Sequence, residues 1–239
     1  MNQQLLEEIV APDISHIVIE DDTPVDNFQS EKQQRLLVEP LYSSWSPGNS
    51  YIAAANVGIF SADDQEGIAP DVFLSLDVSM PGDWSQKQNR SYLVWRFGKF
   101  PEVVIEIVSN RKGNELVTNS DKLCKKDAYA RMGVAYYAVF DPLQQIQDSD
   151  QMNGALLKVF VLTGKHYIEL AHPFWMEDVA LGLTLWEGEF EGVEERWLRW
   201  CDHDGRVIPT GAEGREIQRQ RAERLAERLQ AMGINPDEV

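Results

Sequence analysis

The pattern of apolar and polar positions predicts a helix near the start of the chain. From Ser30 onward, apolar residues recur at intervals of three and four, which places them on one helix face. These residues are Leu36, Leu37, Leu41, Tyr42 and Trp45. Ser30 is the predicted N-cap, with Gln33 three residues later completing a capping box. The run Ser-Pro-Gly-Asn at 46–49 predicts a break after this helix.

Seven strand-like segments follow. They cover residues 51–60, 71–78, 103–108, 134–140, 155–162, 166–170 and 181–186. Residues 71–78 alternate between apolar and polar, as in a strand with one buried face. Residues 103–108 are apolar on both faces apart from one carboxylate, which is typical of a strand buried on both sides.

A second helix is predicted over residues 121–131, ending at Gly133. It lies between the third and fourth strand segments. Strand, helix and strand in this order indicate a crossover and a parallel pair of buried strands. The later strands have short, turn-like connections that favour a meander. The fold class is therefore α/β (α+β), a mixed sheet flanked by helices.

The C-terminal part has a different pattern. The segments Trp-Leu-Arg-Trp (197–200) and Arg-Val-Ile-Pro (206–209) flank an Asp-His-Asp-Gly turn and predict a hairpin. From Arg215 to Met232 the chain is charged and has one apolar stripe, which predicts an amphipathic helix. The expected organisation is a flexible acidic arm (1–26), a core domain (27–190), a hairpin extension (191–212) and a helical tail (213–239).

Charge changes this picture because it is unevenly distributed. The 239 residues carry a formal net charge of −17, which argues against a general polyanion-binding protein. Residues 86–131 nevertheless hold ten basic and five acidic side chains, a local net of +5. Two cysteines are too few for a disulfide framework. Without a signal-like start or a membrane-spanning apolar run, we expect a cytoplasmic protein that does not enter membranes.

Two carboxylates on predicted strands are the first candidates for chemistry. Asp71 lies at the entry of the second strand segment. Glu106 lies within the apolar run 103–108, and an ionised carboxylate there needs a cationic partner such as lysine, arginine or a metal. If the two strands are neighbours, Asp71 and Glu106 converge. Oxygen ligands of this kind suit Mg²⁺ or Mn²⁺.

The second helix supplies candidate lysines. Lys122, Lys125, Lys126 and Tyr129 fall at helical spacing and share one face. The crossover returns this helix over the sheet that carries Glu106. Lys125 is the preferred partner of the carboxylates and Lys122 the second choice, whereas Lys126 is expected on a solvated face.

Four motifs in a fixed order resemble the Uma-two family of restriction-endonuclease-like proteins, within the PD-(D/E)XK nuclease superfamily. They are Ile-Ala-Pro-Asp-Val (68–72), Pro-Glu-Val-Val-Ile-Glu-Ile-Val-Ser-Asn (101–110), the segment 125–137 and Asp-Pro (141–142). The resemblance covers roughly residues 25–190. It implies a restriction-endonuclease-like core in which Asp71 and Glu106 hold a divalent metal and a lysine acts at the scissile phosphate. It also places an acidic residue on the first helix, for which Glu31 is the candidate.

The chain departs from the superfamily pattern at one position. The usual lysine two residues after the acidic residue is replaced here by Val108. The resemblance instead points to Lys125, four residues before Tyr129. The resulting hypothesis is a Mg²⁺- or Mn²⁺-dependent endonuclease that hydrolyses phosphodiester bonds in DNA. The alternative is a weak or inactive nuclease fold that acts as a binding or assembly module and forms a homodimer through its core or C-terminal helix.

Overall fold

The computed structural model describes residues 27–62, 67–111, 113–117, 123–233 and 235. The whole predicted arm at 1–26, and Lys122, lie outside the described residues. The helices are α1 (Phe28–Ser44), α2 (Val94–Phe97), α3 (Lys125–Met132) and α4 (Gly211–Ala231), with short 3₁₀ turns at Lys87–Asn89 and Glu177–Val179. The strands are β1 (Tyr51–Ala55), β2 (Ile59–Phe60), β3 (Val72–Leu76), β4 (Tyr92–Leu93), β5 (Val103–Ile107), β6 (Tyr136–Phe140), β7 (Leu157–Thr163), β8 (His166–Glu169), β9 (Phe174–Met176), β10 (Leu181–Phe190) and β11 (Val193–Cys201).

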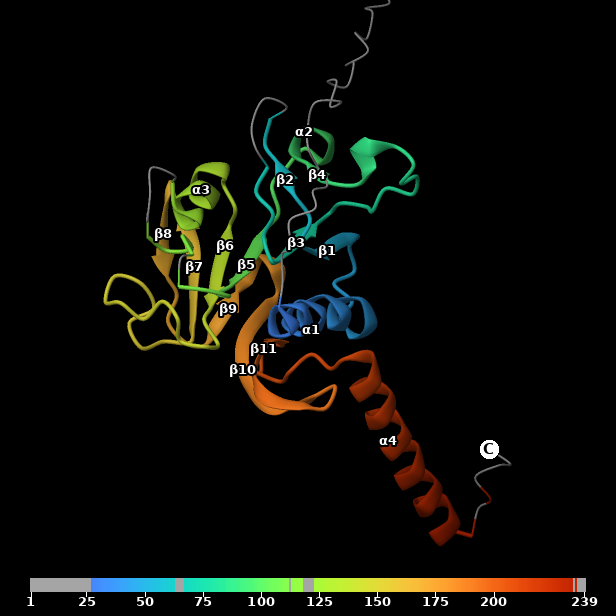
Figure 1. The fold of residues 1–239 in the computed structure, drawn as a ribbon. Coiled ribbons are helices and arrows are strands. Elements are labelled where there is room, and N and C mark those ends of the chain that lie inside the picture. The colour runs from blue at the N-terminus through green and yellow to red at the C-terminus, as the bar shows by residue number, and fades with distance from the viewer. Residues whose placement is uncertain (1–26, 63–66, 112, 118–122, 234, 236–239) are drawn as a thin grey trace, which may run out of the picture.

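A six-stranded mixed sheet in the order β1-β3-β5-β6-β7-β8 forms the centre of the molecule (Figure 1). Strands β5 and β6 are parallel, and every other adjacent pair in this sheet is antiparallel. Helix α3 connects the two parallel strands, which confirms the predicted crossover. The meander predicted after it is also present as β6, β7 and β8. The fold is therefore mixed α+β, as the sequence pattern indicates.

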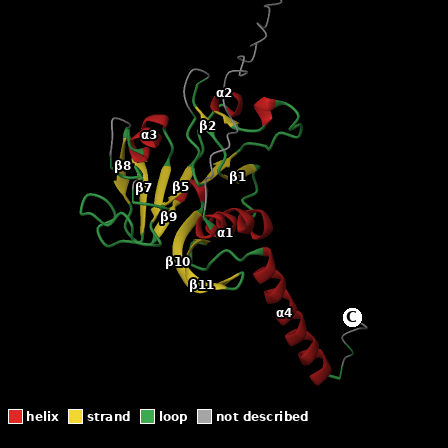
Figure 2. Cartoon of the chain, in the orientation of Figure 1, coloured by secondary structure: helices red, strands yellow, loops and turns green. Residues whose placement is uncertain are grey.

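The central sheet is covered on both faces (Figure 2). Helix α1 and the three-stranded sheet β9–β11 pack on one face, where Leu37 and Leu41 contact the core side of β3 and β5. Helix α3 and the short parallel pair β2–β4 lie on the other face, where Tyr129 and Tyr92 belong to a second apolar cluster. Because both faces are covered, β5 is buried at all five positions.

The structure corrects the predicted start of the first helix. Its N-cap is Asn27, whose side chain accepts a hydrogen bond from the Ser30 amide at 2.9 Å. Ser30 itself lies inside the helix and is buried. The predicted strand 51–60 is also divided, because Asn56 adopts a positive φ of 53° between β1 and β2.

The predicted hairpin between residues 197–200 and 206–209 is present in part, since a tight turn is closed by the hydrogen bond from the Gly205 amide to the Asp202 carbonyl at 2.9 Å. Strand β11 pairs along its whole length with β10, and the chain turns at Glu191 and Gly192, which both have positive φ. The segment after the tight turn is joined to the end of β11 by a bridge between Cys201 and Val207 and by the hydrogen bond from the Ile208 amide to the Trp200 carbonyl at 2.9 Å. The far halves of both strands are largely exposed, so they lack the apolar alternation by which a strand is recognised in sequence.

The predicted C-terminal helix is present as α4. Helix α4 begins at a capping box formed by Thr210 and Glu213 and projects away from the rest of the molecule (Figure 1). None of its residues is buried. Within the described ranges, no helix combines the length and the apolarity needed to cross a membrane.

Candidate active site

Asp71 is the residue directly before β3. Its Oδ2 accepts a hydrogen bond from the Ile107 backbone amide at 2.6 Å, and its Oδ1 accepts one from Gln34 Nε2 at 3.1 Å. The first contact links Asp71 to β5, and the second links it to α1. The carboxylate is therefore fixed from two sides by elements far apart in the sequence.

Glu106 lies in the adjacent strand β5 and is almost completely buried, with 1% of its surface exposed. Its Oε1 accepts a hydrogen bond from the Tyr129 hydroxyl at 2.9 Å, and its Oε2 accepts one from Lys125 Nζ at 2.7 Å. A buried carboxylate requires this kind of compensation. The predicted cationic partner of Glu106 is thus Lys125.

Helix α3 delivers both partners of Glu106. Lys125 and Tyr129 are four residues apart and face the sheet together. The helix ends at Gly133, whose φ of 87° suits glycine in a left-handed C-cap and lets the chain enter β6. Lys126 points elsewhere, with its ammonium 4.1 Å from the centre of the Phe160 ring. The expected solvated face for Lys126 is therefore only partly correct, because the side chain packs on an aromatic ring.

The charges of Asp71, Glu106 and Lys125 act on one another. Burial and the neighbouring Glu106 raise the pKa of Asp71 to about 7, against the opposing effect of the Ile107 amide and Lys125. Burial by itself would lower the pKa of Lys125, but the contact with Glu106 outweighs it and holds that pKa above its ordinary value. Lys125 is therefore an ammonium at neutral pH. It can stabilise negative charge, and it cannot take a proton from water.

The donor set fits a magnesium or manganese ion. Asp71 and Glu106 place carboxylate oxygens next to each other, and their mutual repulsion is what a divalent cation would relieve. No group of three or more histidine, cysteine, aspartate or glutamate side chains suited to a metal occurs in the part of the chain that the structure describes. Mg²⁺, however, is commonly held by one or two carboxylates, with water and substrate phosphate completing its shell.

The structure does not bring Glu31 to this site. Its side chain is about half exposed and pairs with Arg35, one turn along α1. The residue of α1 that reaches Asp71 is Gln34, which is buried and also exchanges hydrogen bonds with Asn56. The sequence held one signal for this role. Gln34 lies three residues before Leu37 and therefore on the apolar, inward face of the predicted helix, where a polar residue is unusual.

Glu115 is a third acidic side chain that sequence reasoning missed. It is 7% exposed, and its Oε2 has no hydrogen-bond partner among the described residues. Burial raises its pKa, while the nearby Lys125 opposes that rise. The segment is fixed to the start of α3, since Glu115 O accepts a hydrogen bond from the Lys126 amide at 3.1 Å. Glu115 therefore adds negative charge to the surroundings of Lys125.

Asp141, in the last of the four motifs, has a structural role. It is fully buried after β6 and accepts hydrogen bonds from the amides of Gln145 and Ile146 and from the side chain of Gln147. These contacts close the loop that leads to β7. Within the described residues, the convergent groups are thus Asp71, Glu106 and Lys125, supported by Gln34 and Tyr129.

Comparison with known proteins gives a family match and a similar solved structure. Residues 14–179 match the model of the Uma2 family, described as "Putative restriction endonuclease". The crystal structure of a "putative nuclease belonging to DUF820" from Anabaena variabilis ATCC 29413 is similar at 16% sequence identity and a TM-score of 0.36, over 63% of this chain and 72% of that one. No curated protein matches the chain.

Proposed function

Because the chain belongs to the Uma2 family of restriction-endonuclease-like proteins, we propose that it is a Mg²⁺- or Mn²⁺-dependent endonuclease that hydrolyses phosphodiester bonds in DNA. The observation that carries the proposal is the convergence of Asp71, Glu106 and Lys125 at one end of β3 and β5. Two carboxylates and one ammonium are the groups that metal-assisted phosphodiester hydrolysis needs.

Each of these side chains has a distinct task in the proposal. Asp71 and Glu106 would hold the metal, which when bound lowers the pKa of a coordinated water and neutralises charge on the phosphate. Lys125 places a permanent positive charge beside the carboxylates and would stabilise the extra negative charge that develops on the phosphate. Tyr129 and Gln34 act as positioning residues, because each donates a hydrogen bond to one of the two carboxylates.

The charge distribution sets an expectation for substrate binding. The molecule as a whole is strongly acidic, so its long-range field repels a polyanion. The basic segment 86–131 contains Lys125 and offers a local attraction. Binding to DNA should therefore be weak and salt-sensitive, with a substantial contribution from the metal.

A cleavage assay tests the proposal. Supercoiled and single-stranded DNA are incubated with the full chain in Mg²⁺, in Mn²⁺ and in EDTA, beside the Glu106→Gln variant and the matched control Glu31→Gln. We expect cleavage with either metal, none in EDTA, loss of at least about 100-fold in Glu106→Gln and no change in Glu31→Gln. Absence of cleavage under all conditions, or equal cleavage by Glu106→Gln, would refute the proposal.

A second candidate function, an assembly module, is favoured by helix α4. This helix has no buried residue and carries exposed apolar side chains at Ile217 and Leu225, followed by exposed Met232 at its C-cap. An exposed apolar stripe of this kind would be covered if two copies of the chain paired their tails. Light scattering would then give a dimer for the full chain and a monomer for a chain truncated after Glu216. A monomeric full chain would exclude this function.

A further inference from the structure

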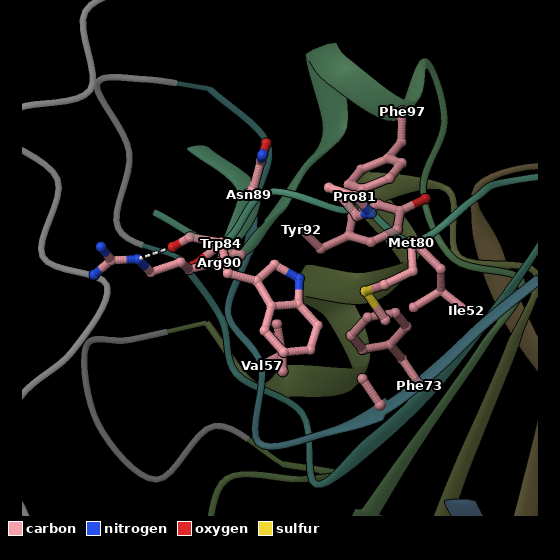
Figure 3. A pocket seen from close by; sticks show the side chains of 12 residues that line it. Ile52, Val57, Phe73, Met80, Pro81, Trp84, Asn89, Arg90, Tyr92 and Phe97 are labelled. Atoms are coloured by element: carbon pink, nitrogen blue, oxygen red, sulfur yellow. Dashed lines mark hydrogen bonds between the residues drawn. The ribbon is translucent and has the colours of Figure 1, made fainter. Parts of the chain in front are cut away.

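A cavity of about 460 Å³ lies on the same face of the central sheet as Glu106, and no role has yet been given to it. Its volume is within the range of small-molecule binding pockets. Figure 3 shows its lining, which is mainly apolar and aromatic. The side chains used below are Phe73, Trp84, Arg90, Tyr92 and Phe97.

The floor of the cavity is a preformed aromatic cluster. The rings of Tyr92 and Phe97 are stacked with centres 4.4 Å apart, and Phe73 packs edge-on against Tyr92 at 5.2 Å. The Tyr92 hydroxyl is anchored by Ser75 Oγ at 2.9 Å and by the Lys99 carbonyl at 3.0 Å. A floor held in this way needs no rearrangement to accept a flat ring.

Trp84 lies at the mouth of the cavity and is 64% exposed. Figure 3 shows its indole standing close to Tyr92 and Phe73 rather than pointing away from them. An indole left this exposed beside a cavity offers a free π-face to a ligand, as in proteins that stack bases of single strands.

The cavity is close to the candidate active site. Phe73 follows Asp71 by two residues on the same face of the strand, a separation of about 7 Å along the chain. In the link that follows the neighbouring strand β1, Val57 lines the cavity, and the preceding Asn56 donates its backbone amide to the Asp71 carbonyl at 3.2 Å. The cavity therefore lies within reach of a nucleotide whose neighbouring phosphate is at Asp71.

Arg90 is the charged residue among those that line the cavity. The segment 80–99 around it contains four basic residues against Asp83, and its Lys99 pairs with Glu102 just beyond the segment. The Arg90 side chain extends away from the aromatic rings, as Figure 3 shows, with its Nε donating to the Trp84 carbonyl at 2.9 Å. A second nitrogen of the guanidinium donates to the Ser85 carbonyl at 3.3 Å, so the positive charge of Arg90 is held beside the cavity and not inside it.

We propose that this cavity binds an unpaired nucleobase of the nucleic acid strand held at the candidate active site. The inference rests on the proposed function and gives its substrate a structural requirement, namely a single-stranded or locally opened strand. Aromatic walls suit the π-face of any base, and the positive charge of Arg90 beside the cavity attracts the neighbouring phosphate.

Fluorescence of a base analogue tests the inference by binding alone. A short single-stranded DNA with one 2-aminopurine is titrated with the full chain in EDTA and low salt, so that cleavage cannot interfere. We expect quenching of the 2-aminopurine when it enters the cavity, and binding at least about tenfold weaker in Trp84→Ala. Trp84→Phe should restore most of the affinity, because a stacking ring is retained. Phe28→Ala, which removes an exposed aromatic ring from α1, is the matched control and should bind like the wild type.

The outcomes separate this inference from the proposed function. DNA cleavage that is metal-dependent together with equal affinities of Trp84→Ala and wild type would overturn the base pocket and leave the nuclease intact. Trp84-dependent quenching without any cleavage would leave the base pocket intact and refute the nuclease. Equal binding of an intact strand and a strand in which every residue is abasic would also overturn the pocket. A single-stranded RNA of the same sequence then tells whether the sugar matters.

Discussion

Lys125 on α3 and Glu106 on β5 form an ion pair of 2.7 Å in which the carboxylate is 1% exposed and the lysine side chain 29% exposed. The pair joins the crossover helix α3 to the central strand β5. Asp71 lies beside it, because its carboxylate accepts a hydrogen bond from the amide of Ile107, the residue after Glu106. Because the buried partner is the carboxylate, the lysine is needed for stability as well as for the proposed chemistry. Several consequences can be measured separately.

Replacing Lys125 by methionine should destabilise the protein and abolish cleavage. The change leaves the Glu106 carboxylate without its cation in a buried position, at a cost of about 3 kcal/mol in the free energy of unfolding. Lys126→Met is the matched control on the same helix. It removes only the ammonium–ring contact with Phe160, worth about 1 kcal/mol, and should leave cleavage unchanged. Urea unfolding and the DNA assay measure the two effects, and equal behaviour of the two variants would contradict the assignment.

The stability of the metal-free protein should fall as pH rises from about 4 to 7. The pKa of Asp71 is raised from 3.8 to about 7 by burial and by Glu106, so the folded chain retains a proton that the unfolded chain has released in this window. The slope from this group is at most about 1.4 kcal/mol per pH unit, and it levels off above the folded-state pKa. Urea unfolding in EDTA across this range provides the measurement.

Variants identify the group responsible for that pH dependence. Asp71→Asn should remove most of the fall, because its side chain does not titrate. Glu115→Gln should remove a smaller part, since burial also raises the pKa of Glu115. A curve for Asp71→Asn that coincides with the wild type would show that Asp71 titrates in the folded state as it does in the unfolded chain.

Gln34, and not Glu31, should be the residue of α1 that affects the active site. Gln34→Ala removes the hydrogen bond to Asp71 Oδ1, with an expected loss of about 1 kcal/mol in stability and at least about tenfold in cleavage rate. Glu31→Ala removes only an exposed pair with Arg35 and should change stability by less than about 0.5 kcal/mol. Initial cleavage rates and thermal unfolding of both variants decide the question. A larger loss of cleavage in Glu31→Ala would reverse the assignment.

Glu213 should stabilise the protein although most of α4 is exposed. Arg199 is buried in β11 and donates hydrogen bonds to both carboxylate oxygens of Glu213, at 3.1 and 2.7 Å. Glu213→Gln keeps an N3 side chain able to complete the capping box but removes the charge, and should cost about 3 kcal/mol. Glu216→Gln, one turn further and exposed, should cost less than about 0.5 kcal/mol. Comparable melting temperatures for the two variants would show that the Arg199 pair contributes little.

The sequence by itself determined the elements whose patterns are strongly periodic or strongly apolar. These include the first helix, the buried strand around Glu106 and the helix that ends at Gly133. It also determined that Glu106 needs a cation, because an ionised carboxylate between apolar neighbours cannot remain uncompensated. In the outer half of the β10–β11 hairpin no position is fully buried until Trp197, so no such pattern exists and this pairing was not predicted.

Only the tertiary structure decided which side chains meet. The position of α1 against the sheet determines that Gln34 reaches Asp71 while Glu31, three residues earlier, faces solvent. The path of the chain before α3 buries Glu115 near Lys125, although no local pattern marks it. The aromatic cavity combines side chains from β1, β3 and residues 80–97. Contacts of this kind depend on the packing of segments distant in sequence, and local periodicity holds no information about that packing.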